Sequence, residues 1–84
     1  MLDIEVNVKL DCRGMSCPMP VFKTSKALKN LKVGETLEVI SSDPGFVLDI
    51  QALVRQTQNK LLVTQEMNDH VFRYVIEKTQ QNLG

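Results

Sequence analysis

Residues 4–10 alternate between apolar and polar side chains. Ile4, Val6, Val8 and Leu10 are apolar, and the positions between them are polar. A period of two places every second side chain on one face of an extended strand. The pattern therefore predicts a first strand that ends at Leu10 and buries one face.

A helical period replaces this alternation after Pro18. Apolar or small residues at helical spacing, with lysines between them, predict an amphipathic helix that begins at Pro18 and reaches Leu31. The positions assigned to its apolar face are Val21, Phe22, Ser25, Leu28 and Leu31. Gly34 suits the turn that leaves the helix, and residues 36–41 predict a short buried strand.

The pattern predicts a second helix and two further strands in the rest of the chain. Asp43 is a candidate N-cap, Pro44 suits the first helical position, and an apolar stripe runs from residue 46 to residue 57. Strand-like segments follow at residues 60–66 and 70–78, with a hairpin turn expected at residues 67–69.

The order strand, helix, strand, helix, strand, strand favours an α/β (α+β) two-layer sandwich with both helices on one face of a four-stranded sheet. The 84 residues form one expected domain with an ordered core at about residues 3–78.

Charge and hydropathy exclude several function classes. Ten basic and ten acidic residues give a net charge of +0, which is unlike a nucleic-acid binder. Basic residues predominate locally, because residues 13–33 contain five of them and no acidic one. No apolar run approaches the roughly 20 residues of a membrane span, and the N-terminus lacks a signal-peptide pattern. We therefore expect a cytoplasmic protein with no membrane partner.

Both cysteines lie in the sequence DCRGMSCPMP, residues 11–20. Cys17 directly precedes Pro18, which makes it the expected N-cap of the first helix. The unpaired N–H groups and the dipole of the helix would then lower the pKa of its thiol. Pro18 and Pro20 stiffen the first turn, and Gly14 permits a tight loop before it.

Each of these residues also has a plain structural interpretation. Cys17 on spacing alone is equally compatible with an inert buried thiol. Cys12 suits a core-facing position better, with a role as an auxiliary thiol as the alternative. No ligand set suits a metal, since His70 is expected to be exposed and no ligand pair has a standard spacing.

Residues around Cys17 are candidates for partner docking. Arg13 adds positive charge if the loop folds back, and Lys23 and Lys26 repeat along the first helix together with Lys29 and Lys32. Met15 and Met19 would form an adaptable apolar rim if exposed. The alternatives are a solvated lysine face and ordinary packing of the methionines.

The stretch from Asp11 to Val21 resembles the Cys-Pro-X-Pro signature of the TusA (SirA-like, YedF-like) family of small sulfur carriers. Residues 31–39, 42–50 and 72–78 resemble the segments that follow in that family, so the similarity covers roughly Leu10 to Lys78. Met19 and Phe46 stand where glutamate and serine are frequent in the family, which affects surfaces that partners contact.

This resemblance implies a mixed four-stranded sheet, no cofactor, and a persulfide carried on Cys17. The expected partners are a cysteine desulfurase or rhodanese-like sulfur donor and a downstream acceptor protein. tRNA thiolation, cofactor synthesis and sulfur oxidation are the uses known in the family. The alternative is a partner-binding or redox-regulatory module without sulfur transfer. We expect a monomer or a weak homodimer through the exposed sheet edge.

Overall fold

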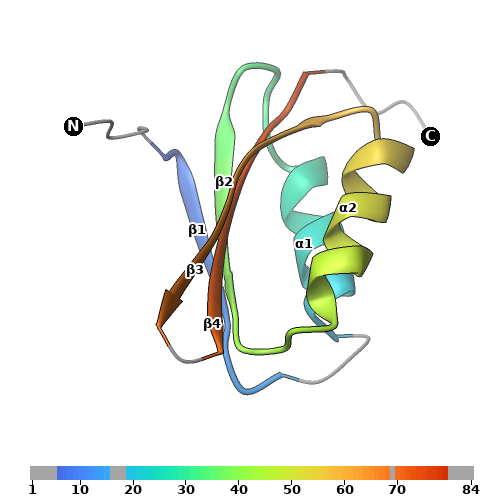
Figure 1. Ribbon diagram of the computed structural model, residues 1–84. Coiled ribbons are helices and arrows are strands. Elements are labelled where there is room, and N and C mark those ends of the chain that lie inside the picture. Colours follow the sequence, from blue (N-terminus) through green and yellow to red (C-terminus); the bar gives the residue numbers. More distant parts are fainter. Residues whose placement is uncertain (1–5, 16–18, 69, 80–84) are drawn as a thin grey trace.

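Four strands form one sheet, and two helices cover one of its faces (Figure 1). The computed structural model describes residues 6–15, 19–68 and 70–79. Its elements in chain order are β1 (Val8–Cys12), α1 (Met19–Lys29), β2 (Thr36–Ser41), α2 (Phe46–Gln56), β3 (Lys60–Asn68) and β4 (Val71–Glu77). Neither helix has the length and apolar content needed to cross a membrane, within the residues the structure describes.

The strand order β1-β2-β4-β3 makes the sheet mixed. β1 pairs with β2 in parallel, and β4 pairs antiparallel with both β2 and β3. A parallel pair needs a crossover connection, which α1 supplies between β1 and β2. The predicted fold class and element order are confirmed.

The alternation in β1 is confirmed, but the strand ends later than predicted. Val8 is exposed, Leu10 is half-buried and Cys12 is fully buried, so one face enters the core progressively along the strand. The pairing with β2 continues from Leu10 to Cys12, which lies opposite Ser41. Backbone pairing with a neighbour therefore extends β1 by two residues that the local pattern assigned to a loop.

The predicted apolar face of α1 is wrong at Phe22. The buried residues of the helix are Pro20, Thr24 and Leu28, while the Phe22 side chain is 63% exposed. Successive helical residues turn by about 100°, so Phe22 stands about 200° from Pro20 and faces away from the sheet. α1 thus packs on the sheet through side chains that are smaller than that of Phe22. It begins at Met19 in the structure, and Pro18 lies outside the described residues.

The predicted start of α2 is also wrong. Gly45 occupies the N-cap position, and Asp43 and Pro44 precede the helix. The Asp43 carboxylate accepts a hydrogen bond from the Gly45 amide at 3.0 Å, and the Phe46 amide donates to the Asp43 carbonyl. Asp43 thus stabilises a turn that leads into α2, as aspartate commonly does.

The hairpin between β3 and β4 falls later than residues 67–69. β3 continues to Asn68, which lies opposite Val71 at the start of β4. Asp69 lies outside the described residues, and His70 has a φ of +59° and is exposed, as expected. Pairing across the hairpin has therefore shortened the turn.

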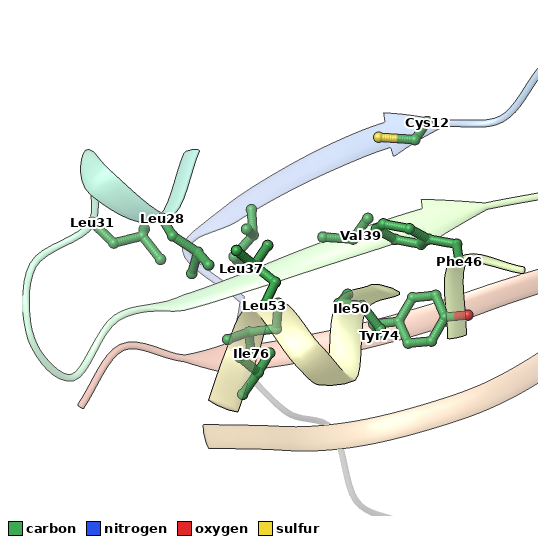
Figure 2. Close-up of a cluster of buried hydrophobic side chains, with 11 residues drawn as sticks. Cys12, Leu28, Leu31, Leu37, Val39, Phe46, Ile50, Leu53, Tyr74 and Ile76 are labelled. Atoms are coloured by element: carbon green, nitrogen blue, oxygen red, sulfur yellow. The ribbon is translucent and has the colours of Figure 1, made fainter. Parts of the chain in front are cut away.

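The core lies between the helices and the sheet (Figure 2). Phe46 at the start of α2 meets Tyr74 of β4 edge to face, with ring centroids 5.5 Å apart. Such aromatic pairs contribute beyond the area they bury. Among the described residues, the other members of this buried cluster are Cys12, Leu28, Leu31, Leu37, Val39, Ile50, Leu53, Val54 and Ile76.

A buried lysine joins the end of β4 to the end of α1. The Lys78 side chain is 2% exposed, and its ammonium donates a hydrogen bond of 2.7 Å to the Leu28 carbonyl. A second carbonyl, that of Lys29, lies at 3.5 Å. A cation at this position satisfies carbonyls that have no partner within the helix and interacts favourably with its dipole.

Candidate functional site

One end of the molecule brings the loop that the sequence marked as functional close to the loop that follows β2. The carboxyl ends of the parallel strands β1 and β2 and the amino ends of α1 and α2 lie at this end (Figure 1). Sites in sheets with parallel strands commonly lie beyond the strand carboxyl ends. The chain from β1 to α1, which contains the Cys-Pro-X-Pro sequence, connects two elements here.

Cys17, together with Ser16 and Pro18, lies outside the described residues. The predicted N-cap position and the lowered thiol pKa of Cys17 therefore stay predictions. The structure describes the residues on either side, up to Met15 and from Met19 onward.

Arg13 is paired with an acid in its own loop. Its guanidinium contacts the Asp11 carboxylate through Nε and Nη2, the latter at 2.8 Å, and its amide also donates to Asp11. These hydrogen bonds hold the pKa of Asp11 at about 2, below its ordinary 3.8. Arg13 is thus partly neutralised locally, and sequence inspection missed this pairing.

Gly14 takes the conformation that was expected of it. Its φ is +79°, a region that side chains with a Cβ rarely enter. The Gly14 amide donates to the Ser42 hydroxyl at 3.0 Å, and the Met15 amide donates to the Cys12 carbonyl at 3.2 Å. The first bond connects the loop after β1 to the loop after β2. Ser42 was not singled out from the sequence, where only its neighbour Asp43 gave a signal.

Cys12 lies in the core, where the sequence favoured placing it. The residue is 0% exposed and belongs to the buried hydrophobic cluster (Figure 2). Burial raises the pKa of the Cys12 thiol, and the charge of Lys23 opposes this rise only in part. A protonated, buried thiol is a poor nucleophile. An auxiliary role for Cys12 would therefore require the site to open.

The structure separates the other candidate residues. Pro20 is buried in the first turn of α1, and Met15 is half-buried against the core. Met19, at 47% exposure, and the lysines Lys23 and Lys26 are exposed on α1. Met15 therefore packs much as an ordinary loop residue does, whereas Met19 is accessible.

Two buried hydroxyl groups have no hydrogen-bond partner in the described structure. They belong to Thr24 on α1 and Tyr74 on β4. Burial, and next the negative charge of Asp43, raise the pKa of Tyr74, so this phenol stays protonated. Its ring lies beside Phe46 and its hydroxyl points beyond that ring (Figure 2).

No group of three or more potential ligands gathers to hold a metal ion in the part of the chain that is described. The surface of that part also shows no pocket. This end of the molecule combines an exposed Met19 at the start of α1 with two loops that a hydrogen bond connects.

Comparison with known proteins identifies the family. The family model described as "Sulfurtransferase TusA" matches residues 8–78, which include every described helix and strand. The chain belongs to the TusA sulfurtransferase family. The resemblance noted from Leu10 to Lys78 is thus confirmed.

Relatives and a solved structure agree with this membership. The sulfur carrier protein TusA of Allochromatium vinosum is 37% identical over 84% of this chain and 92% of its own. A Halobacterium salinarum protein with a provisional sulfur-carrier name is 41% identical over 93% and 96%, respectively. The crystal structure of a SirA-like protein from Desulfitobacterium hafniense has a TM-score of 0.79, covering 88% of this chain and all of the other. At 21% identity, that structure supports the fold alone.

Proposed function

We propose that this TusA-family protein is a sulfur carrier that accepts sulfane sulfur as a persulfide on Cys17 and passes it to an acceptor protein. The observation that carries the proposal is the Cys17-Pro-X-Pro20 sequence, which runs into the first turn of α1, in a chain of this family. Unpaired N–H groups at the start of a helix favour a thiolate over a thiol. The position of Cys17 in the sequence thus supports a reactive sulfur.

The proposed transfer needs no cofactor and no net oxidation. The Cys17 thiolate attacks the terminal sulfur of a donor persulfide, R–S–SH. A new S–S bond forms as the donor S–S bond breaks, and the donor leaves as R–S⁻. The terminal sulfur and its proton end on Cys17. Transfer to the acceptor repeats this exchange, whose rate depends on access and on the acidity of the leaving thiol.

The direct test is intact-protein mass spectrometry without reductant, after incubation with inorganic polysulfide. We expect wild type and Cys12→Ser to gain reducible sulfur atoms, and Cys17→Ser to gain none. Loss of the addition in both variants would indicate that the two cysteines act together. An absence of addition to wild type would contradict the carrier function and favour a partner-binding module.

A further inference from the structure

The chain that follows β1 forms a turn whose own hydrogen bonds define its shape. The Met15 amide donates to the Cys12 carbonyl at 3.2 Å, and Gly14 within the turn has a φ of +79°. A positive φ at the third position of a turn is typical of glycine. Arg13 donates to Asp11 through both its amide and its guanidinium. These bonds shape the turn but do not attach it to another segment.

One side chain from another loop bonds to the backbone of this turn. The Gly14 amide donates to the Ser42 hydroxyl at 3.0 Å, across 28 positions of the sequence. In the described part of the chain, the other hydrogen bonds of the turn are with Asp11 and Cys12. Met15 adds apolar packing against the core, which is less directional. Ser42 therefore provides the directional attachment of the turn to the loop that follows β2.

The backbone on both sides of Ser42 is itself held in place. Ser41 is 0% exposed, and it lies opposite Cys12 at the end of the pairing between β1 and β2. The Ser41 hydroxyl accepts a hydrogen bond of 3.1 Å from the Asp43 amide, and the Asp43 carboxylate accepts one from Gly45. Supporting bonds of this kind fix the position of a side chain that acts on a functional segment. The half-buried Ser42 is thus a well-defined acceptor for the turn.

We propose that Ser42 is a positioning residue for sulfur transfer at Cys17, because its hydroxyl holds the turn from which the chain continues to the reactive cysteine. This inference rests on the proposed function. Gly14 precedes Cys17 by three residues, and three residues span at most about 11 Å of extended chain. A displacement of the turn at Gly14 is therefore transmitted to Cys17 over a short distance.

The hydrogen bond favours one placement of the segment over others. A neutral hydrogen bond shifts such an equilibrium by about twofold to tenfold. Without it, a larger fraction of molecules would hold the Cys17 thiol away from the amides at the helix start, where its pKa is that of an ordinary cysteine. The observed rate of a thiolate reaction is proportional to the population of the competent placement. Loss of the Ser42 hydroxyl should therefore slow the reaction at neutral pH and move its pH profile to higher pH.

The test measures alkylation of Cys17 by iodoacetamide as a function of pH in the full chain. Peptide mass spectrometry distinguishes the modification of Cys17 from that of Cys12. Ser42→Ala should slow alkylation at neutral pH by about twofold to tenfold and approach the wild-type rate at a pH above the thiol pKa. The initial rate of sulfur acceptance from inorganic polysulfide at neutral pH should fall by a similar factor. Ser42→Thr keeps a hydroxyl acceptor and should restore the wild-type profile.

A matched control lies at the opposite end of the sheet. The Thr79 hydroxyl donates to the Gln58 carbonyl at 2.6 Å, across 21 positions, and this bond is exposed like that of Ser42. Thr79 follows β4, whose last residue Glu77 pairs with the first residue of β2. Thr79→Ala thus removes a comparable bond between distant segments and should keep the wild-type profile. Urea denaturation of both variants shows whether any difference between them follows from stability alone.

The outcomes separate this proposal from the proposed function. If polysulfide does not load wild-type Cys17, the carrier function itself is wrong. If polysulfide loads wild type and Ser42→Ala has the wild-type rates and pH profile, the positioning proposal is wrong and the carrier function stands. The proposal is also wrong if Thr79→Ala moves the profile as far as Ser42→Ala does, or if Ser42→Thr behaves like Ser42→Ala.

Discussion

At the scale of single residues, burial determines the chemistry of Cys12. Cys12 is the last residue of β1 and is buried in the core, where desolvation raises the pKa of its thiol. A raised pKa favours the protonated form in the folded state. The resulting contribution to stability is complete below the thiol pKa of the unfolded chain and is lost as the pH rises through the folded value.

We therefore expect the Cys12 thiol to be unreactive in the folded protein. In Cys17→Ser, the aromatic disulfide 5,5′-dithiobis(2-nitrobenzoate) should release little nitrothiobenzoate near neutral pH until urea unfolds the chain. Absorbance measured with and without urea gives the result. A fast reaction in the absence of urea would show that Cys12 is accessible and would favour its role as an auxiliary thiol.

The pairing of Asp11 with Arg13 gives a second prediction at this scale. Arg13→Gln should raise the pKa of Asp11 from about 2 toward its ordinary 3.8, because the guanidinium hydrogen bonds are lost. Because the pKa of Asp11 is lowered in the folded state, the pair stabilises the protein above the pKa that Asp11 has in the unfolded chain. This stabilisation is lost as the pH falls through the pKa of Asp11 in the folded protein. An NMR titration of the Asp11 carboxyl carbon measures the shift. An unchanged pKa in Arg13→Gln would mean that the pair does not form in solution.

At the scale of elements, contacts between distant segments connect the loops that lead to both helices and hold the end of α1. The Gly14 to Ser42 hydrogen bond connects the loops that lead to α1 and α2. Lys78 binds the last carbonyls of α1 although 50 positions separate it from Leu28. The orientation of α1, and with it the exposure of Phe22, thus depends on contacts beyond the helix.

Replacement of Lys78 should destabilise the protein through the end of α1. Lys78→Met keeps most of the aliphatic stem but leaves the Leu28 carbonyl without its buried partner. The expected loss in the free energy of unfolding is about 1.5–3 kcal/mol, the range for hydrogen bonds to charged groups. Urea denaturation measures it, with exposed Lys29→Met as the control. Equal stability of the two variants would contradict the capping role of Lys78.

At the scale of the whole molecule, one shared core holds the two layers together. Leu37 lies on β2, between β1 and β4, and is fully buried against the helices. A chain of 84 residues buries a limited apolar area and has a correspondingly small stability. Each large core side chain therefore contributes a substantial fraction of the total.

Leu37→Ala should lower the free energy of unfolding by about 2–5 kcal/mol, because it leaves a cavity in the centre of the core. The total free energy of unfolding of a protein is about 5–15 kcal/mol, so Leu37→Ala should be near its unfolding transition at moderate temperature. Thermal unfolding followed by circular dichroism tests this, with exposed Val33→Ala as the control. A melting temperature equal to that of the control would mean that Leu37 is not central to the core.

Local sequence pattern was sufficient for the order and type of every element. Period-two and helical spacings arise from the geometry of a single strand or helix, and Gly14 needs no distant partner to favour its turn. The motif around Cys17 is likewise continuous in the sequence, so residues 11–20 are enough to indicate the family. The roles of Cys17 and Pro18 stay predictions, because those residues lie outside the described part of the chain.

Features that join distant segments could not be predicted in this way. The extension of β1 to Cys12 depends on pairing with β2, and the start of α2 depends on the turn at Asp43. The outward direction of Phe22 follows from how α1 rotates onto the sheet, a choice made by packing. The periodicity of a single helix or strand does not indicate these interactions, because they form only when strands pair and the helices pack on the sheet.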